Sequence, residues 1–171
     1  MGSAAETRLA LAELACDTGR SNEAKQLARD ARKVFQAQNQ AHDEILAAAL
    51  LSRPLLDQGK LAEAAASLDV LLKVSEKISD VTTRLSLTLA HANVLAGAKD
   101  LAAAERAARK VLAEAPKDLV WLRLEASLTL AEIQSKGKNA AEGHRRLQEV
   151  SRAAREKGFE LIVHQASAPQ L

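Results

Sequence analysis

The feature that most constrains the fold of this chain is an internal repeat of about 40 residues. Each of four segments begins with an apolar helix-forming run, meets a short turn and restarts as a second helix-forming run. A small residue follows each turn, and these residues recur at intervals of 40, 40 and 39: Ala24, Ala64, Ala104 and Gly143. A period of this length is typical of proteins built from stacked repeats, in which each unit packs on its neighbours.

A second ladder of small residues runs in register with the first, twelve positions earlier in every unit. Its members are Ala12, Ser52, Ala92 and Ala131. Small side chains at one height on two helices let the backbones approach closely and the ridges interlock. Helix propensity in an alanine-rich chain is the alternative explanation of such a ladder. Two ladders in register favour paired helices.

Composition points to an all-α fold. Ala (36) and Leu (27) supply 63 of the 171 residues, whereas Gly contributes 7, Pro 3, and the aromatics are Phe35, Phe159 and Trp121. Ala and Leu are strong helix formers, and the β-branched and aromatic residues that favour strands are scarce. We therefore predict a single helical domain over residues 1–171, with units near 4–40, 41–77, 78–116 and 117–157.

The repeat predicts eight helices in antiparallel pairs. The first helices of the units are expected near 4–18, 42–58, 78–96 and 118–136, and the second helices near 21–38, 60–76, 100–115 and 139–157. Gly19 and Gly59 are expected to end first helices in a left-handed conformation. Lys99 stands at that position in the third unit, so Gly97 is expected to end the helix there.

The two ends of the stack are expected to differ. Residues 158–168 follow the last unit and include Phe159, Leu161, Ile162 and Val163, so we predict a ninth helix that caps the exposed apolar face. No equivalent segment precedes Ala4. The N-terminal face is therefore expected to be uncapped, either because a parent protein continues upstream or because another copy packs there. The abrupt start after Met-Gly-Ser favours a domain excised from a longer protein.

The turn at 59–64, Gly-Lys-Leu-Ala-Glu-Ala, and that at 99–104, Lys-Asp-Leu-Ala-Ala-Ala, with their flanking ladders, resemble the tetratricopeptide repeat over most of residues 4–157. That family usually has a Trp or Tyr in the first helix and a Pro after the second; here Pro116 alone stands at such a place, and Tyr is absent. The unit exceeds the standard ~34 residues, which implies a variant with about one extra helical turn per hairpin. HEAT and armadillo units share the longer period, and Pro54 is similar to the kink of HEAT helices.

The resemblance implies a right-handed α-solenoid of four antiparallel helix hairpins plus the C-terminal capping helix. It also implies a concave groove lined by the first helices. We expect the positions one after and eight before the second ladder to line this groove with Glu13, Glu44, Arg53, Arg84, Asn93, Arg123 and Glu132. Its walls are expected to be basic toward the C-terminal half, where Arg84 and Arg123 fall. The alternative is that these charges form a solvated helix face.

Three positions before the same ladder the series is apolar: Leu9, Ala49, Leu89 and Leu128. These residues either form the floor of the groove or pack between helices. They also occupy the positions at which the family's clamp for a chain-terminal carboxylate would need a lysine. That clamp is therefore not expected, although Asn93 matches one of its asparagines.

Charge argues against a nucleic-acid partner, because 24 Lys and Arg residues are nearly balanced by 22 Asp and Glu residues. The most basic stretch, between Arg145 and Lys157, alternates with Glu142, Glu149 and Glu156 at helical spacing, so we expect ion pairs along a solvated helix.

No catalytic or metal-binding motif is evident, so the chain is not expected to be an enzyme or to hold a cofactor. The four histidines are scattered, and there is no HExxH motif, no Cys-x-x-Cys pair and no phosphate-binding glycine loop. Cys16 is the single cysteine, so no intrachain disulfide is expected. We interpret His91 and Cys16 as packing residues.

These observations predict a non-catalytic scaffold for protein–protein interaction that binds a peptide or partner segment in the concave groove, without nucleic acid or membrane. The alternative is a structural or self-association segment of a larger bacterial signalling or transcription-regulatory protein, which forms a homo-oligomer through its N-terminal hairpin. No signal peptide and no apolar run of ~18 residues is seen, which favours a cytoplasmic location.

Overall fold

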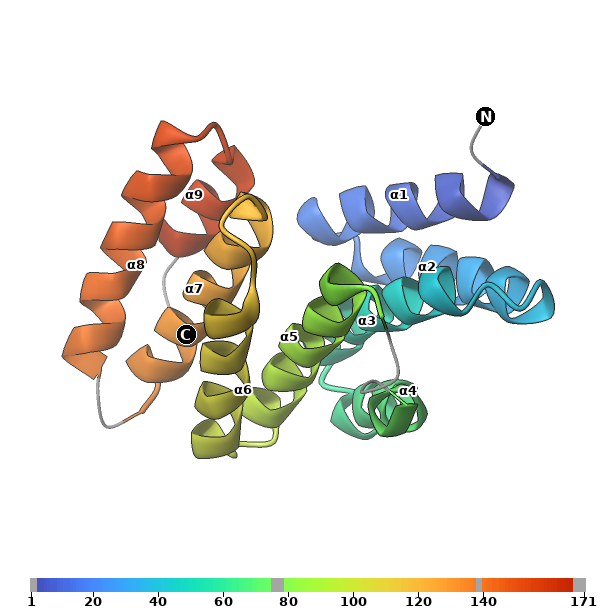
Figure 1. The fold of residues 1–171 in the computed structure, drawn as a ribbon, viewed down its shortest axis with the longest axis horizontal. Helices are drawn as coiled ribbons and strands as arrows, with labels where there is room; N and C mark the ends of the chain where they lie inside the picture. Colours follow the sequence, from blue (N-terminus) through green and yellow to red (C-terminus); the bar gives the residue numbers. More distant parts are fainter. Residues whose placement is uncertain (1–2, 75–78, 138–139, 168–171) are drawn as a thin grey trace.

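The computed structural model describes residues 3–74, 79–137 and 140–167. In these ranges the chain is all-helical, with nine helices and no strands (Figure 1). The helices are α1 (Ala4–Asp17), α2 (Ser21–Ala37), α3 (Ala41–Asp57), α4 (Leu61–Val74), α5 (Val81–Gly97), α6 (Leu101–Glu114), α7 (Val120–Ser135), α8 (Ala140–Glu156) and α9 (Glu160–Ser167).

The predicted all-α class is confirmed. The predicted helix ends at 76, 78, 139 and 168 lie outside the described residues, and the other ends agree with the structure to within two residues. No helix of the described chain is both long enough and apolar enough to span a bilayer.

The helices α1, α2, α3, α5 and α8 each end before a residue with a left-handed backbone conformation. Gly19, Gly59 and Gly158 have φ of 71°, 68° and 78°, and Asn39 and Lys99 have φ of 55° and 64°. The next amide then donates to a carbonyl five residues back; the N–H of Lys60, for example, lies 2.8 Å from the oxygen of Leu55. This pattern is that of the Schellman motif.

The expectation that Gly97 ends its helix with a left-handed turn is wrong. Gly97 is the last residue of α5 and has no positive φ, whereas Lys99 takes the left-handed conformation itself. The N–H of Asp100 then donates to the oxygen of Leu95 at 3.0 Å, and the Asp100 carboxylate caps α6 by accepting from the N–H of Ala103 at 3.1 Å. The left-handed residue of the third turn therefore follows Gly59 at the same interval at which Gly59 follows Gly19.

Both ladders of small residues lie at helix contacts. The second ladder is completely buried: Ala12, Ser52, Ala92 and Ala131 are each 0% exposed. Gly143, the last member of the first ladder, shows how close the approach is. A Cβ added there would lie 2.7 Å from Cα of Ser135 and would meet its backbone nitrogen too. Only glycine fits where α8 crosses the end of α7.

Each helix packs mainly on helices one or two places away in the chain. Figure 1 accordingly shows the helices following one another from α1 and α2 at one side of the view to α8 and α9 at the other. The core is divided into successive clusters instead of one centre.

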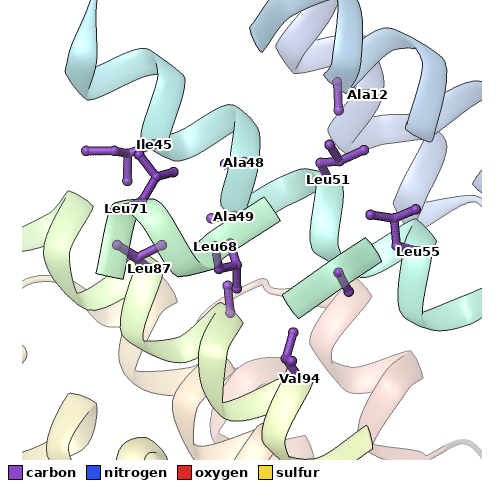
Figure 2. Packing of buried hydrophobic residues seen from close by; sticks show 13 residues of the cluster. Ala12, Ile45, Ala48, Ala49, Leu51, Leu55, Leu68, Leu71, Leu87 and Val94 are labelled. Atoms are coloured by element: carbon purple, nitrogen blue, oxygen red, sulfur yellow. The ribbon is translucent and has the colours of Figure 1, made fainter. Parts of the chain in front are cut away.

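The largest cluster contains residues of every helix from α1 to α5. Figure 2 shows Leu51, Leu55, Leu68 and Val94 within this cluster. At the other end, α9 packs Ile162 and Val163 against α7 and α8.

The outer surface of α8 carries the expected ion pairs. Arg145 lies 2.7 Å from Glu142 and 4.0 Å from Glu149, and Arg146 lies 3.5 Å from Glu142. Arg145 and Glu149 are exposed and Glu142 and Arg146 are partly exposed, so these pairs contribute little to stability. The prediction that these charges serve a solvated helix face is confirmed for the described residues.

Candidate functional site: a groove along the first helices

A cavity of about 530 Å³ lies along α1, α3, α5 and α7, which correspond to the first helices of the predicted units. Residues of α1, α3, α5 and α7 form most of its lining, and Leu101 of α6 and Gln165 of α9 complete it. We call this cavity the groove. A ligand lying along it would contact every repeat of the chain, because each first helix contributes at least one lining residue.

The floor of the groove is apolar. It comprises Leu56, Leu89, Leu101, Leu128 and Ile133. Leu89 and Leu128 come from the apolar series three positions before the ladder, and each is only 6% exposed. All four members of that series belong to the core clusters, and Leu89 and Leu128 also line the groove.

Arg53 is the main positive charge of one wall. Its Nη2 donates to Oδ1 of Asp17 at 3.1 Å and so ties the end of α1 to α3. Burial lowers the pKa of Arg53, but the nearby Cys16, Asp17 and Glu125 together outweigh burial and leave the pKa raised. The guanidinium is therefore permanently charged, and its direct partner is already present in the fold.

Glu125 and Glu132 carry the opposite charge on the α7 wall. Burial raises the pKa of Glu125; the positive charge of Arg53 opposes this shift, whereas Glu13 and Asp17 add to it. Burial likewise raises the pKa of Glu132, and Lys136 opposes that shift.

Neither carboxylate forms an ion pair or a side-chain hydrogen bond with another residue of the described chain. Both are therefore partly desolvated without a direct partner.

Cys16, which we interpreted as a packing residue, is half-buried and also lines the groove. Burial raises the pKa of its thiol to about 11, although the positive charge of Arg53 acts in the opposite direction. Because it is the single cysteine of the chain, it offers one chemical reporter inside the groove.

Three of the seven predicted groove residues line the groove: Arg53, Asn93 and Glu132. All three occupy the position one after the ladder. Glu13 occupies the same position in the first unit but lies outside the lining, although its charge helps to raise the pKa of Cys16 and of Glu125.

The other three predicted residues lie outside the lining and serve other contacts. Glu44 accepts a hydrogen bond from Gln36 at 2.7 Å. Arg84 pairs with Glu114 at 3.7 Å. Arg123 donates to the oxygens of Leu112 and Ala115 at 3.0 and 2.8 Å, and so satisfies carbonyls at the end of α6.

Helix geometry explains this division. The positions one after and eight before the ladder are nine residues apart, about two and a half turns, and so lie on opposite faces of a helix. Seven residues are close to two full turns. Glu125 lies seven residues before Glu132, so this spacing could have identified it as a groove residue, although it was not among the predicted ones.

The groove consequently differs in charge from the expectation. Its C-terminal half is acidic rather than basic, because Glu125 and Glu132 of α7 line it and Arg84 and Arg123 do not. Within the described ranges no group of His, Cys, Asp and Glu side chains is arranged to hold a metal ion.

Comparison with family models, curated proteins and solved structures finds no match for this chain. The groove is therefore the feature of the molecule from which its function can be inferred.

Proposed function

We propose that this protein is a non-catalytic interaction module that binds a peptide or an extended segment of a partner protein in the groove. The observation that carries this proposal is one cavity lined by all four first helices, with an apolar floor and charged walls. Binding sites of this kind use apolar contact for affinity and a few placed polar groups for orientation.

We further propose that the helices form four tetratricopeptide-like hairpins in a right-handed α-solenoid, with α9 as the cap. The near-neighbour packing of the helices supports this proposal, as do the buried small-residue ladders. The recurring left-handed stops at Gly19, Gly59 and Lys99 add the expected period.

A steric plug in the groove tests the proposal. Asn93→Trp places an indole in the cavity, and Gln26→Trp puts the same ring on the exposed surface of α2 as a matched control. We expect affinity capture from cells of the source organism to recover one or more partners with the wild type and Gln26→Trp but not with Asn93→Trp. Circular dichroism verifies that both variants remain folded. If Asn93→Trp retains every wild-type partner, the groove is not the binding site.

One observation favours self-association as a second candidate function. Leu11 and Leu14 on α1 are 47% and 52% exposed, and residues three apart share one face of a helix. A second copy packed on this face would cover both leucines. Light scattering over a wide concentration range tests this candidate: a dimer that Leu11→Glu disrupts supports it, and a monomer at all concentrations excludes it.

A further inference from the structure

Acidic side chains outnumber basic ones in the lining of the groove. Three acidic residues line it, Asp57, Glu125 and Glu132, against the two bases Arg53 and Lys136. Arg53 is already paired with Asp17, so its charge is compensated within the fold. The net field that a ligand meets is therefore negative.

The backbone adds to this field. Asp57 and Gly97 are the last residues of α3 and α5, and both line the groove. The C-terminal end of a helix carries a partial negative charge of about half an electron, which is felt within the last turn. Two such ends open on the same cavity and favour a cation there.

The two carboxylates of α7 place two negative charges at a defined distance from each other. Glu125 and Glu132 are seven residues apart on one helix, so they share a face and stand about 10 Å apart along its axis. Both are partly desolvated, and neither has a direct partner within the described chain. Within the fold each charge is only partly compensated, by Arg53 at Glu125 and by Lys136 at Glu132, so a ligand cation at each position would complete that compensation.

We propose that the groove recognises a cationic amphipathic peptide segment, with apolar side chains on the floor at Leu89, Leu128 and Ile133 and two Lys or Arg side chains against Glu125 and Glu132. The inference rests on the proposed function. The two cations stand about 10 Å apart, which corresponds to three residues of a polyproline II segment, whose turn is three residues, or to seven residues of a helix. An acidic peptide is repelled by the same groups.

Selection from a displayed library of random peptides of about twelve residues tests the proposal. We expect peptides that bind the wild type to be enriched in Lys and Arg over the input library, with a dominant spacing of three or seven residues. Their affinity should fall as salt rises, because the charge–charge contribution is screened.

Matched variants locate the effect. Glu125→Gln/Glu132→Gln should weaken the selected peptides by about tenfold or more. Glu149→Gln/Glu156→Gln is the control, because it removes two exposed carboxylates at the same seven-residue spacing on the outer helix α8; it should change affinity less than about twofold.

The outcomes separate this inference from the proposed function. Neutral or acidic selected peptides that Asn93→Trp displaces would overturn the cationic assignment and leave the groove as a peptide site. Basic peptides that bind Glu125→Gln/Glu132→Gln as tightly as wild type would also overturn it. If no selected peptide is weakened by Asn93→Trp, both the inference and the proposed function fail.

Discussion

Replacing Gly143 by alanine should destabilise this protein, although the same change in an ordinary helix stabilises it. Gly143 lies in the interior of α8, where alanine is favoured over glycine by about 1 kcal/mol of intrinsic helix propensity. Here the new Cβ would lie 2.7 Å from Cα of Ser135 and 2.8 Å from the carbonyl carbon of Gln134. Carbon atoms in contact normally stand about 3.5–4.0 Å apart.

The magnitude follows from what must move. The obstructing atoms belong to the backbone of α7 and cannot rotate away, so α8 has to retreat by about 1 Å. That shift loosens the packing of Leu147 and Val150, which are each 5% exposed. Overpacking of this kind costs about 1–3 kcal/mol and occasionally more. Because backbone atoms are in the way, we place the cost at the upper end of this range, about 3 kcal/mol. The propensity gain of about 1 kcal/mol then leaves a net loss of about 2 kcal/mol, or a fall in Tm of about 4–8 °C.

Urea denaturation followed by circular dichroism measures the effect, with Gly97→Ala as the control. A Cβ at Gly97 meets only the side-chain ends of Leu56 and Leu61, at 3.2 and 3.3 Å, and these can give way. Gly97→Ala should therefore lie within about 1 kcal/mol of the wild type. An unfolding midpoint for Gly143→Ala at or above that of the wild type would show that α7 and α8 do not approach this closely.

Four further predictions concern single sites. Lys99→Gly should raise the free energy of unfolding by about 1 kcal/mol in the same assay, because it relieves a left-handed conformation that a side chain disfavours. Phe35→Ala should lower it by about 3–5 kcal/mol, because Phe35 is fully buried. Alkylation of Cys16 should accelerate with pH up to about 11, and Arg53→Gln should slow it at a given pH by raising the thiol pKa further. Glu125→Gln should stabilise the fold at neutral pH, with the gain over wild type vanishing once acid protonates the wild-type carboxyl; equal stability at neutral pH would contradict the burial argument.

Proton linkage explains why Glu125→Gln should raise the free energy of unfolding at neutral pH. Burial holds the folded-state pKa of Glu125 above its unfolded value, so the folded chain binds the proton more readily. Stability from this group is present below the unfolded pKa and is lost as pH rises through the folded pKa. Glutamine is neutral throughout, so it avoids that loss at neutral pH.

The helices could be predicted from the sequence because their signals are local and repeated. Alanine and leucine fill the helices, and the ladder residue Ala12 recurs as Ser52, Ala92 and Ala131 at the same depth of burial. The third turn was the exception, because a local preference for glycine pointed to Gly97. Hairpin geometry in fact requires the stop at Lys99, one position before the residue that caps α6.

The groove was predicted only in part because lining depends on which face of each helix turns inward. The series one position after the second ladder, which begins with Glu13, includes the lining residues Arg53, Asn93 and Glu132. The series eight positions before the ladder, which includes Glu44, is rotated by half a helical turn and contacts other helices instead. Cys16 stands at the same place in its unit as Leu56 and Ala96, which also line the groove, so the repeat spacing could have found it. Gln165 lies in α9, outside the repeats, and spacing could not assign it.

The face that each first helix turns toward the cavity therefore decides the charge of this site. Arg84 and Arg123 would make a basic groove suited to an acidic ligand, whereas Glu125 and Glu132 make it acidic, although both pairs lie on first helices. The fold uses the two arginines at the second helices, where Arg123 satisfies carbonyls at the end of α6 and Arg84 pairs with Glu114. No comparable duty engages the two glutamates. Because burial without a partner costs free energy, their presence in the groove is better explained by a cationic ligand than by folding.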